Sequence, residues 1–115
     1  MKKQLLTLTV LALAAGTVFA QATDTLAKIK DRGTVNLGVR DSSGLAFTVG
    51  GGKYVGFHTE MAERIVDDLG KSLGKPLKIN YQVITSQNRI PLIQNGTIDF
   101  ECGSTTNNLA RQKDV

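Results

Sequence analysis

Apolar side chains recur along this chain with two alternating periods, one of about two residues and one of about 3.6 residues. Residues 34–39 and 77–84 alternate between apolar and polar positions, as strands do, and 97–102 is predicted as a third, short strand. Between the first two, residues 59–74 carry apolar side chains at three- and four-residue steps, which indicates a helix with one buried face. This order of elements predicts parallel strands joined by right-handed crossovers, that is, an open α/β sheet with flanking helices.

Shorter segments between these elements are delimited by capping residues and glycines. The sequence predicts a short helix over 24–30 that is capped by Asp24 or Thr25 and ended by Gly33, a brief extended piece at 46–49, a helix from Thr85 or Ser86 through Ile93, and a last helix that starts at Asn107 or Asn108.

The first twenty residues have the pattern of a secretory signal peptide. Lys2 and Lys3 precede an apolar run over 5–15, and small residues end the segment at Ala20. The apolar run is shorter than the ~20 residues that a membrane-spanning helix needs. We therefore expect residues 1–20 to be a signal peptide that is cleaved after Ala20, and the rest to be exported rather than embedded in a membrane.

Charge and cysteine content narrow the possible partners. The chain has 14 basic and 10 acidic residues, and two of the basic ones lie in the signal, so 12 remain against 10. This small, scattered excess does not favour nucleic acid. Cys102 is the only cysteine, which leaves no internal disulfide, and residue 21 is Gln, which provides no lipid anchor.

Candidate chemistry falls on the loops that follow the three predicted strands, because ligands of open α/β sheets bind beyond the carboxyl ends of the strands. These loops offer hydroxyl groups and two guanidinium groups, but no metal-ligand cluster, no nucleophile with a base and no phosphate-binding glycine loop. An arginine matches a carboxylate with two parallel hydrogen bonds, so two arginines suggest two carboxylates. Solvated arginines and turn-forming hydroxyl groups are the alternative interpretation. The residues are Arg40, Ser42 and Ser43 after the first strand, Thr85, Ser86 and Arg89 after the second, and Gly103, Ser104 and Thr106 after the third.

A longer stretch carries a resemblance to a known family. Residues 84–108, which read ITSQNRIPLIQNGTIDFECGSTTNN, resemble the solute-binding proteins of polar amino-acid ABC importers, above all the glutamate/aspartate-binding members. The segments 26–33, 35–43 and 55–57 resemble the same family in register. The resemblance implies that residues 21–115 form an incomplete amino-terminal lobe, the partial first lobe of a two-lobed periplasmic-binding-protein (type II) fold. In such proteins the ligand is clamped between the lobes by hinge closure.

The resemblance also implies roles for five residues of the three loops. Arg89 corresponds to the arginine that binds the α-carboxylate of the amino acid, and Ser104 and Thr106 to the donors around that group. Arg40 corresponds to the arginine that reaches the side-chain carboxylate in the acidic-amino-acid subgroup, and Ser86 to the hydroxyl beside it. No metal or cofactor is implied.

The function that the resemblance implies is capture of L-glutamate or L-aspartate in the periplasm by a monomeric, non-enzymatic protein. That protein would deliver its ligand to an ABC permease and its ATPase in the inner membrane. Three alternatives remain open: an exported dehydratase of the same fold that acts on a carboxylated cyclohexadiene, a sensor lobe of a receptor, and a truncated product without a function of its own. The first would need a positioned general acid or base.

Two carboxylates have no role in the site that the resemblance implies. Asp99 and Glu101 occupy alternate positions of the third predicted strand, which would place both on one face. Because like charges repel, each is expected to face solvent or a basic neighbour. We assign them no chemistry from the sequence.

Overall fold

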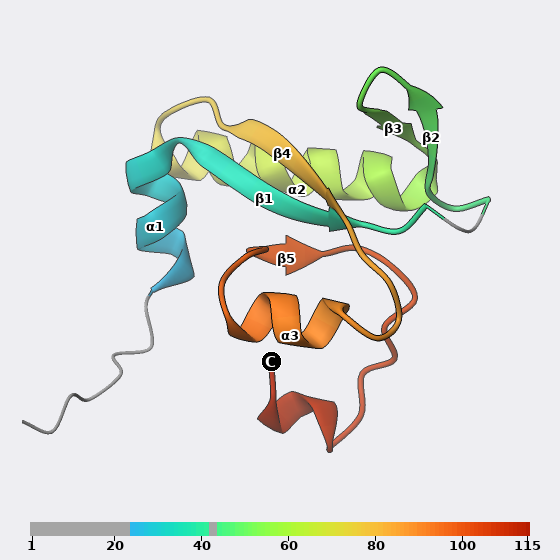
Figure 1. Cartoon of the computed structure of the whole chain (residues 1–115). Coiled ribbons are helices and arrows are strands. Elements are labelled where there is room, and N and C mark those ends of the chain that lie inside the picture. Colours follow the sequence, from blue (N-terminus) through green and yellow to red (C-terminus); the bar gives the residue numbers. More distant parts are fainter. Residues whose placement is uncertain (1–23, 42–43) are drawn as a thin grey trace, which may run out of the picture.

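The computed structural model describes residues 24–41 and 44–115 (Figure 1). The expected signal peptide with its cleavage after Ala20, and the loop residues Ser42 and Ser43, lie outside the described residues. The described part contains a three-stranded parallel sheet with helices and a separate two-stranded hairpin. This architecture confirms the predicted open α/β sheet.

The central strand of the parallel sheet is β1 (Thr34–Val39), and its neighbours are β4 (Lys78–Val83) and β5 (Phe100–Glu101). β1 and β4 pair in register along their whole length, and Figure 1 shows β1 between the other two strands. Because all three strands run in the same direction, their carboxyl ends meet at one edge of the sheet. That edge carries the loops in which the arginines lie.

β5 is shorter than the strand predicted over 97–102, because a side chain replaces part of the backbone ladder. The Asp99 carboxylate Oδ2 accepts a hydrogen bond from the Asn36 N–H at 2.7 Å. The Asp99 N–H in turn donates to the Asn36 carbonyl at 2.8 Å. Regular pairing with β1 therefore starts only at Phe100.

The two longer helices, α1 (Thr25–Arg32) and α2 (Phe57–Leu73), begin and end close to the predicted positions. The Asp24 side chain accepts hydrogen bonds from two N–H groups of the first turn of α1, which confirms it as the N-cap. Gly33 and Gly74 adopt the left-handed conformation that ends each helix. No helix within the described ranges is long and apolar enough to cross a bilayer.

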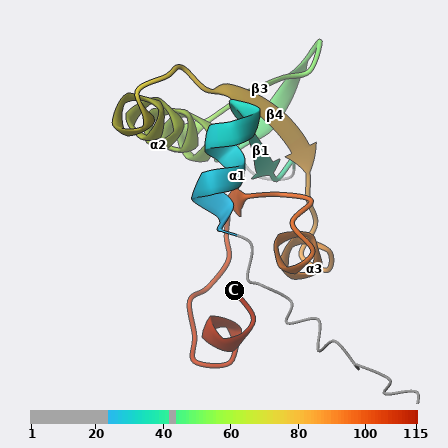
Figure 2. The same cartoon turned by 90° about the vertical axis from the view of Figure 1, so that its left-hand side faces the viewer.

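The hydrophobic core lies between β1 and α2. Val35, Leu37 and Val39 of β1 are buried and pack in clusters with Ala62 and Val66 of α2. Figure 2 shows α2 and α3 on either side of the strands, so the central strand is covered on both faces. The burial of these side chains fixes the position of the end of β1. The next residue, Arg40, therefore lies in the loop at the carboxyl edge of the sheet.

α3 (Arg89–Gln94) begins later than the predicted start at Thr85 or Ser86. The Thr85 hydroxyl accepts hydrogen bonds from the N–H groups of Gln87 and Asn88, and the Asn88 side chain accepts from the Thr85 N–H. These reciprocal bonds close a turn that comes before the helix. The predicted cap residue thus organises the turn, and the helix starts at Arg89.

The last predicted helix, which was to start at Asn107 or Asn108, is reduced to the single 3-10 turn η1 (Arg111–Lys113). The Asn108 side chain accepts a hydrogen bond from the Arg111 N–H at 3.0 Å, but the N-cap residue of the turn is Ala110.

The extended piece predicted at 46–49 is β2 (Phe47–Gly50), which pairs antiparallel with β3 (Lys53–Val55) in a hairpin. The sequence pattern does not predict this pairing. Glycines 50 to 52 all have positive φ values, between 60° and 88°, which glycine adopts at little steric cost.

Candidate functional site

Two of the three candidate loops are joined directly at the carboxyl edge of the sheet. Arg40, the first residue after β1, donates a hydrogen bond from Nη1 to the Ser104 hydroxyl at 2.8 Å. The two residues are 64 positions apart in the sequence, and they meet because β1 and β5 are parallel neighbours. The structure therefore brings Arg40 and Ser104 together at the carboxyl edge of the sheet.

Arg89, the first residue of α3, is buried, with 6% of its surface exposed. Its Nη1 donates a hydrogen bond to the Thr105 hydroxyl at 2.5 Å, and that hydroxyl donates to the Glu101 carboxylate. The Arg89 Nη1 and Glu101 Oε1 atoms are 3.9 Å apart, so the two side chains also form an ion pair. The charge of Arg89 is thus balanced inside the protein.

The two guanidinium groups consequently bind adjacent residues of one loop. Arg40 contacts Ser104 and Arg89 contacts Thr105. Each arginine comes from a different crossover connection, one after β1 and the other after β4. The loop after β5 is therefore the element on which both cations converge.

A cavity of about 290 Å³ opens beside Arg40. Ser86 lines it together with Arg40, so these two predicted site residues share one hollow, whereas Arg89 is not among the lining residues. The full lining is Arg40, Asp41, Val83, Ile84, Thr85, Ser86 and Gln87.

Thr106, the remaining predicted site residue, is exposed. Its described contact is made by its carbonyl oxygen, which accepts a hydrogen bond from Arg111 Nη1 at 2.9 Å. The hydroxyl that binds a guanidinium in this loop belongs instead to its neighbour Thr105. The structure thus places Thr106 in the same loop as Ser104 and Thr105, without a described contact to Arg40 or Arg89.

Glu101 and Thr105 are the site residues that the sequence reasoning missed. Of the two expected surroundings for Asp99 and Glu101, solvent or a basic neighbour, the structure shows the second, since Asp99 pairs with Arg32 at 2.6 Å and Glu101 pairs with Arg89. Glu101 ends β5 at the carboxyl edge of the sheet, beside the start of α3. Its position at the strand end was the signal that could have identified it.

The charge of Glu101 also influences a neighbouring thiol. Burial, and after it the Glu101 charge, raises the pKa of Cys102 above the ordinary range of a thiol. Cys102 therefore stays protonated at neutral pH, which makes it a poor nucleophile.

Within residues 24–41 and 44–115, no group of three His, Cys, Asp or Glu side chains is arranged as metal ligands would be. The arrangement offers cationic hydrogen-bond donors, which suit carboxylates.

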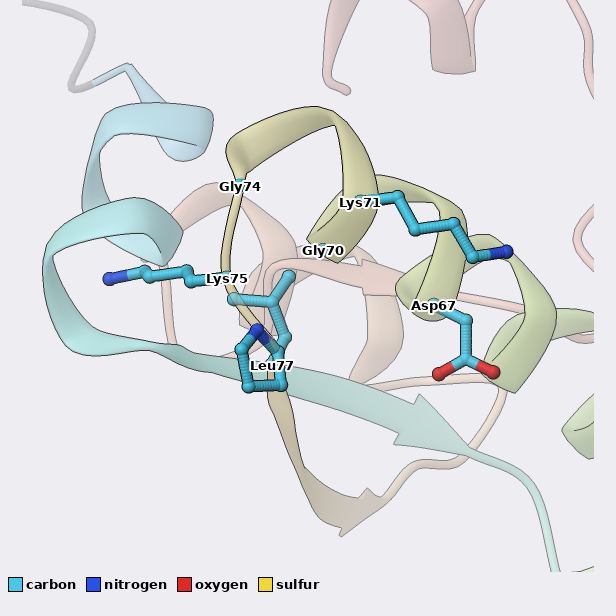
Figure 3. A pocket seen from close by; sticks show the side chains of 7 residues that line it. Asp67, Gly70, Lys71, Gly74, Lys75 and Leu77 are labelled. Carbon is cyan, nitrogen blue, oxygen red and sulfur yellow. The ribbon is translucent and has the colours of Figure 1, made fainter.

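A larger hollow of about 540 Å³ lies at the end of α2, before β4 begins (Figure 3). This hollow lies at the amino edge of the sheet, opposite the edge at which Arg40 and Arg89 lie. Figure 3 shows Lys71 and Lys75 extending in opposite directions, so their ammonium groups do not converge on a common point. This hollow is not part of the candidate site.

Residues 35–115 match the family described as bacterial extracellular solute-binding proteins, family 3. The chain is 49% identical over 107 residues to the L-glutamate/L-aspartate-binding protein of Pseudomonas aeruginosa, covering 90% of this chain and 35% of that protein. It is 47% identical over 113 residues to the glutamate/aspartate import solute-binding protein of Escherichia coli, covering 90% of this chain and 37% of that protein. The chain therefore spans a little more than one third of the length of these curated relatives.

A solved structure shares the fold as a single domain. It is the arginine-bound form of domain 1 from TmArgBP, with a TM-score of 0.62 and 25% sequence identity over 76% of this chain and 64% of that one.

Proposed function

The chain belongs to family 3 of the bacterial extracellular solute-binding proteins, and from this premise we propose that it carries one side of a binding site for L-glutamate or L-aspartate. In this proposal residues 21–115 are an incomplete amino-terminal lobe of the substrate-binding component of an ABC importer. The names of the two similar proteins from Pseudomonas aeruginosa and Escherichia coli support the ligand class.

One observation carries the proposal: two arginines from different connections are held by adjacent residues of the loop after β5. Arg40 binds Ser104, and Arg89 binds Thr105. Two guanidinium groups so placed suit a small molecule with two carboxylates, since each charge-assisted hydrogen bond contributes roughly 1.5 to 3 kcal/mol.

The proposed roles distribute the two carboxylates over the five predicted site residues. Arg89 binds the α-carboxylate with donors from Ser104 and Thr106. Arg40 binds the side-chain carboxylate, assisted by the Ser86 hydroxyl that lines the same cavity. The α-ammonium group is then left for residues of a second lobe.

The remaining assignments follow from this role. We propose that residues 1–20 direct export and are removed after Ala20, that the protein works in the periplasm as a monomer, and that its partners are an ABC permease and its ATPase. We also propose that it is not an enzyme. In support, the buried carboxylate of the site, Glu101, is bound to Thr105 and Arg89 rather than presented as a general base.

The test is a titration of the purified chain with L-glutamate, followed by two-dimensional NMR. One similar structure is a single domain with arginine bound, and this chain covers 64% of it, so we expect weak binding by the chain alone. L-glutamate should shift the signals of Arg40, Ser86, Arg89 and Ser104 at lower concentration than L-glutamine does. Equal responses to both amino acids, or no response, would remove the proposed ligand. Turnover of a carboxylated cyclohexadiene by the chain would favour the dehydratase alternative instead.

A further inference from the structure

Three buried or half-buried side chains form a continuous polar chain behind the proposed site. Arg89 donates to the Thr105 hydroxyl, and the same hydroxyl donates to Glu101. A hydroxyl group has one proton to donate, so Thr105 can accept from the arginine and donate to the carboxylate at the same time. The hydrogen bonds thus run in a single direction, from cation to anion.

Burial makes the two ends of this chain depend on each other. The side chains of Arg89 and Glu101 are each 7% exposed. A buried charge without a partner is strongly destabilising, because the energy lost on leaving water is not regained. The guanidinium and the carboxylate are 3.9 Å apart at their nearest atoms, so Thr105 supplies the short contacts that connect them.

The Glu101 carboxylate is confined by the loop after β5. Its Oε2 atom is buried and has no hydrogen-bond partner among the described residues. Gly103 lies directly against this oxygen, since a Cβ atom added at Gly103 would come within 2.6 Å of it. Gly103 and Thr105 therefore hold the carboxylate from two positions of the loop, on either side of Ser104.

We infer that Glu101 is a positioning residue for Arg89, acting through the Thr105 hydroxyl, and that it serves as the counter-ion of Arg89 while no ligand is bound. The part of this inference that concerns the ligand rests on the proposed function. A ligand carboxylate at Arg89 then adds a second negative charge near Glu101. Without a ligand, the Glu101 charge stabilises the buried Arg89. With a ligand bound, the same charge repels the ligand carboxylate and weakens its binding.

The substitution Glu101→Gln tests both effects, because glutamine has the same shape and still accepts from Thr105 but carries no charge. Two readouts apply to the purified chain: the ¹⁵N and ¹H signals of the Arg89 guanidinium, and the midpoint of thermal unfolding with and without L-glutamate. In the empty variant the Arg89 Nη signals should average through faster rotation, and the midpoint should fall by at least about 5 °C. L-glutamate should bind roughly tenfold more tightly, since a like charge has been removed nearby, and should raise the midpoint more than in the unmodified chain.

Thr105 provides a matched pair of variants that tests the hydrogen bonds from Arg89 through the Thr105 hydroxyl to Glu101. Thr105→Val keeps the shape and removes the hydroxyl, and it should average the Arg89 signals in the same way. Thr105→Ser keeps the hydroxyl and should preserve them. Similar spectra for the two variants would overturn the role given to the Thr105 hydroxyl.

Asp99→Asn is the control, because it removes the charge of the other buried carboxylate of the same strand region. It should lower the midpoint while leaving both the Arg89 signals and the effect of L-glutamate unchanged. Unaltered Arg89 signals in Glu101→Gln, or the same ligand-induced rise in all chains, would overturn the inference. If L-glutamate affects no chain at all, the proposed ligand is wrong, and the signals of the empty variants still decide whether Glu101 positions Arg89.

Discussion

Two carboxylates two residues apart, Asp99 and Glu101, each pair with an arginine, yet their surroundings differ. Asp99 accepts two short hydrogen bonds on one oxygen, from Arg32 at 2.6 Å and from the Asn36 N–H at 2.7 Å. Glu101 reaches Arg89 mainly through Thr105 and keeps a buried oxygen without a partner among the described residues. At the amino edge of the sheet, Asp99 satisfies both Arg32 and the Asn36 N–H. At the carboxyl edge, where ligands bind in this class of sheet, Glu101 still has an oxygen that can accept a hydrogen bond.

Exposure separates the two pairs as well. The Arg32 side chain is 37% exposed, so it reaches solvent if its partner is lost, whereas the Arg89 side chain is 7% exposed and does not. Loss of the carboxylate partner should therefore destabilise the protein more for Arg89 than for Arg32.

Removing each carboxylate should reveal this difference in stability. Glu101→Ala should lower the free energy of unfolding by about 3 to 5 kcal/mol, because the Arg89 charge is left buried and unpaired. Asp99→Ala should cost about 1 to 3 kcal/mol, the penalty for the Asn36 N–H that loses its acceptor. Urea denaturation of both variants gives the two values. The distinction between the edges fails if Asp99→Ala is the more damaging change.

Replacing the arginines should separate the pairs by ligand binding. Arg89→Met should weaken the binding of every amino acid by about a hundredfold or more, since the proposed α-carboxylate contact is lost. Arg32→Met should leave binding unchanged, because Arg32 lies at the opposite edge of the sheet. Calorimetric titration with L-glutamate measures both. Comparable losses in the two variants would mean that Arg89 acts only through folding.

Arg40→Ala tests the second cation of the carboxyl edge. The preference for L-glutamate over L-glutamine should fall by about tenfold, because one charge-assisted hydrogen bond to the side chain is lost. Parallel titrations with the two amino acids measure the ratio of their dissociation constants. A preserved ratio would assign the side-chain carboxylate to another group.

The smallest effect concerns the thiol of Cys102, the residue that follows Glu101 at the carboxyl edge. Burial and then the Glu101 charge raise the Cys102 pKa, so the reactive thiolate is scarce at pH 8 and increases as the pH rises toward that pKa. Glu101→Gln removes the second cause and lowers the pKa, so alkylation by iodoacetamide at pH 8 should accelerate about two- to threefold. Asp99→Asn serves as the comparison. An equal acceleration there would indicate general opening of the structure rather than the Glu101 charge.

Most of the sheet could be predicted because its strands and helix ends follow local rules. The alternation over 34–39 predicted β1 at its observed bounds, and Gly33 and Gly74 stop their helices in the left-handed conformation. One error occurs where a side chain replaces a backbone partner. Asp99 shortens β5 by bonding to Asn36, and a strand pattern does not contain that information.

The candidate site was predictable to the level of its loops. The rule for the carboxyl ends of parallel strands placed Arg40, Ser104 and Arg89 near one another, and the two arginine contacts agree with it. The rule does not say which hydroxyl of a run such as 104–106 faces a given cation. It also does not reveal that Glu101 balances Arg89, because their pairing depends on the packing of α3 against the end of β5.

The loop after β5 holds both cations through consecutive hydroxyl groups, one at Ser104 and the next at Thr105. In the proposed function, selection of the ligand side chain by Arg40 and binding of its α-carboxylate by Arg89 therefore both depend on this loop, since moving either hydroxyl displaces the other. A protein engineer who wishes to retune side-chain preference alone must work from strand β1 and from the wall that contains Ser86, and leave residues 103–105 intact.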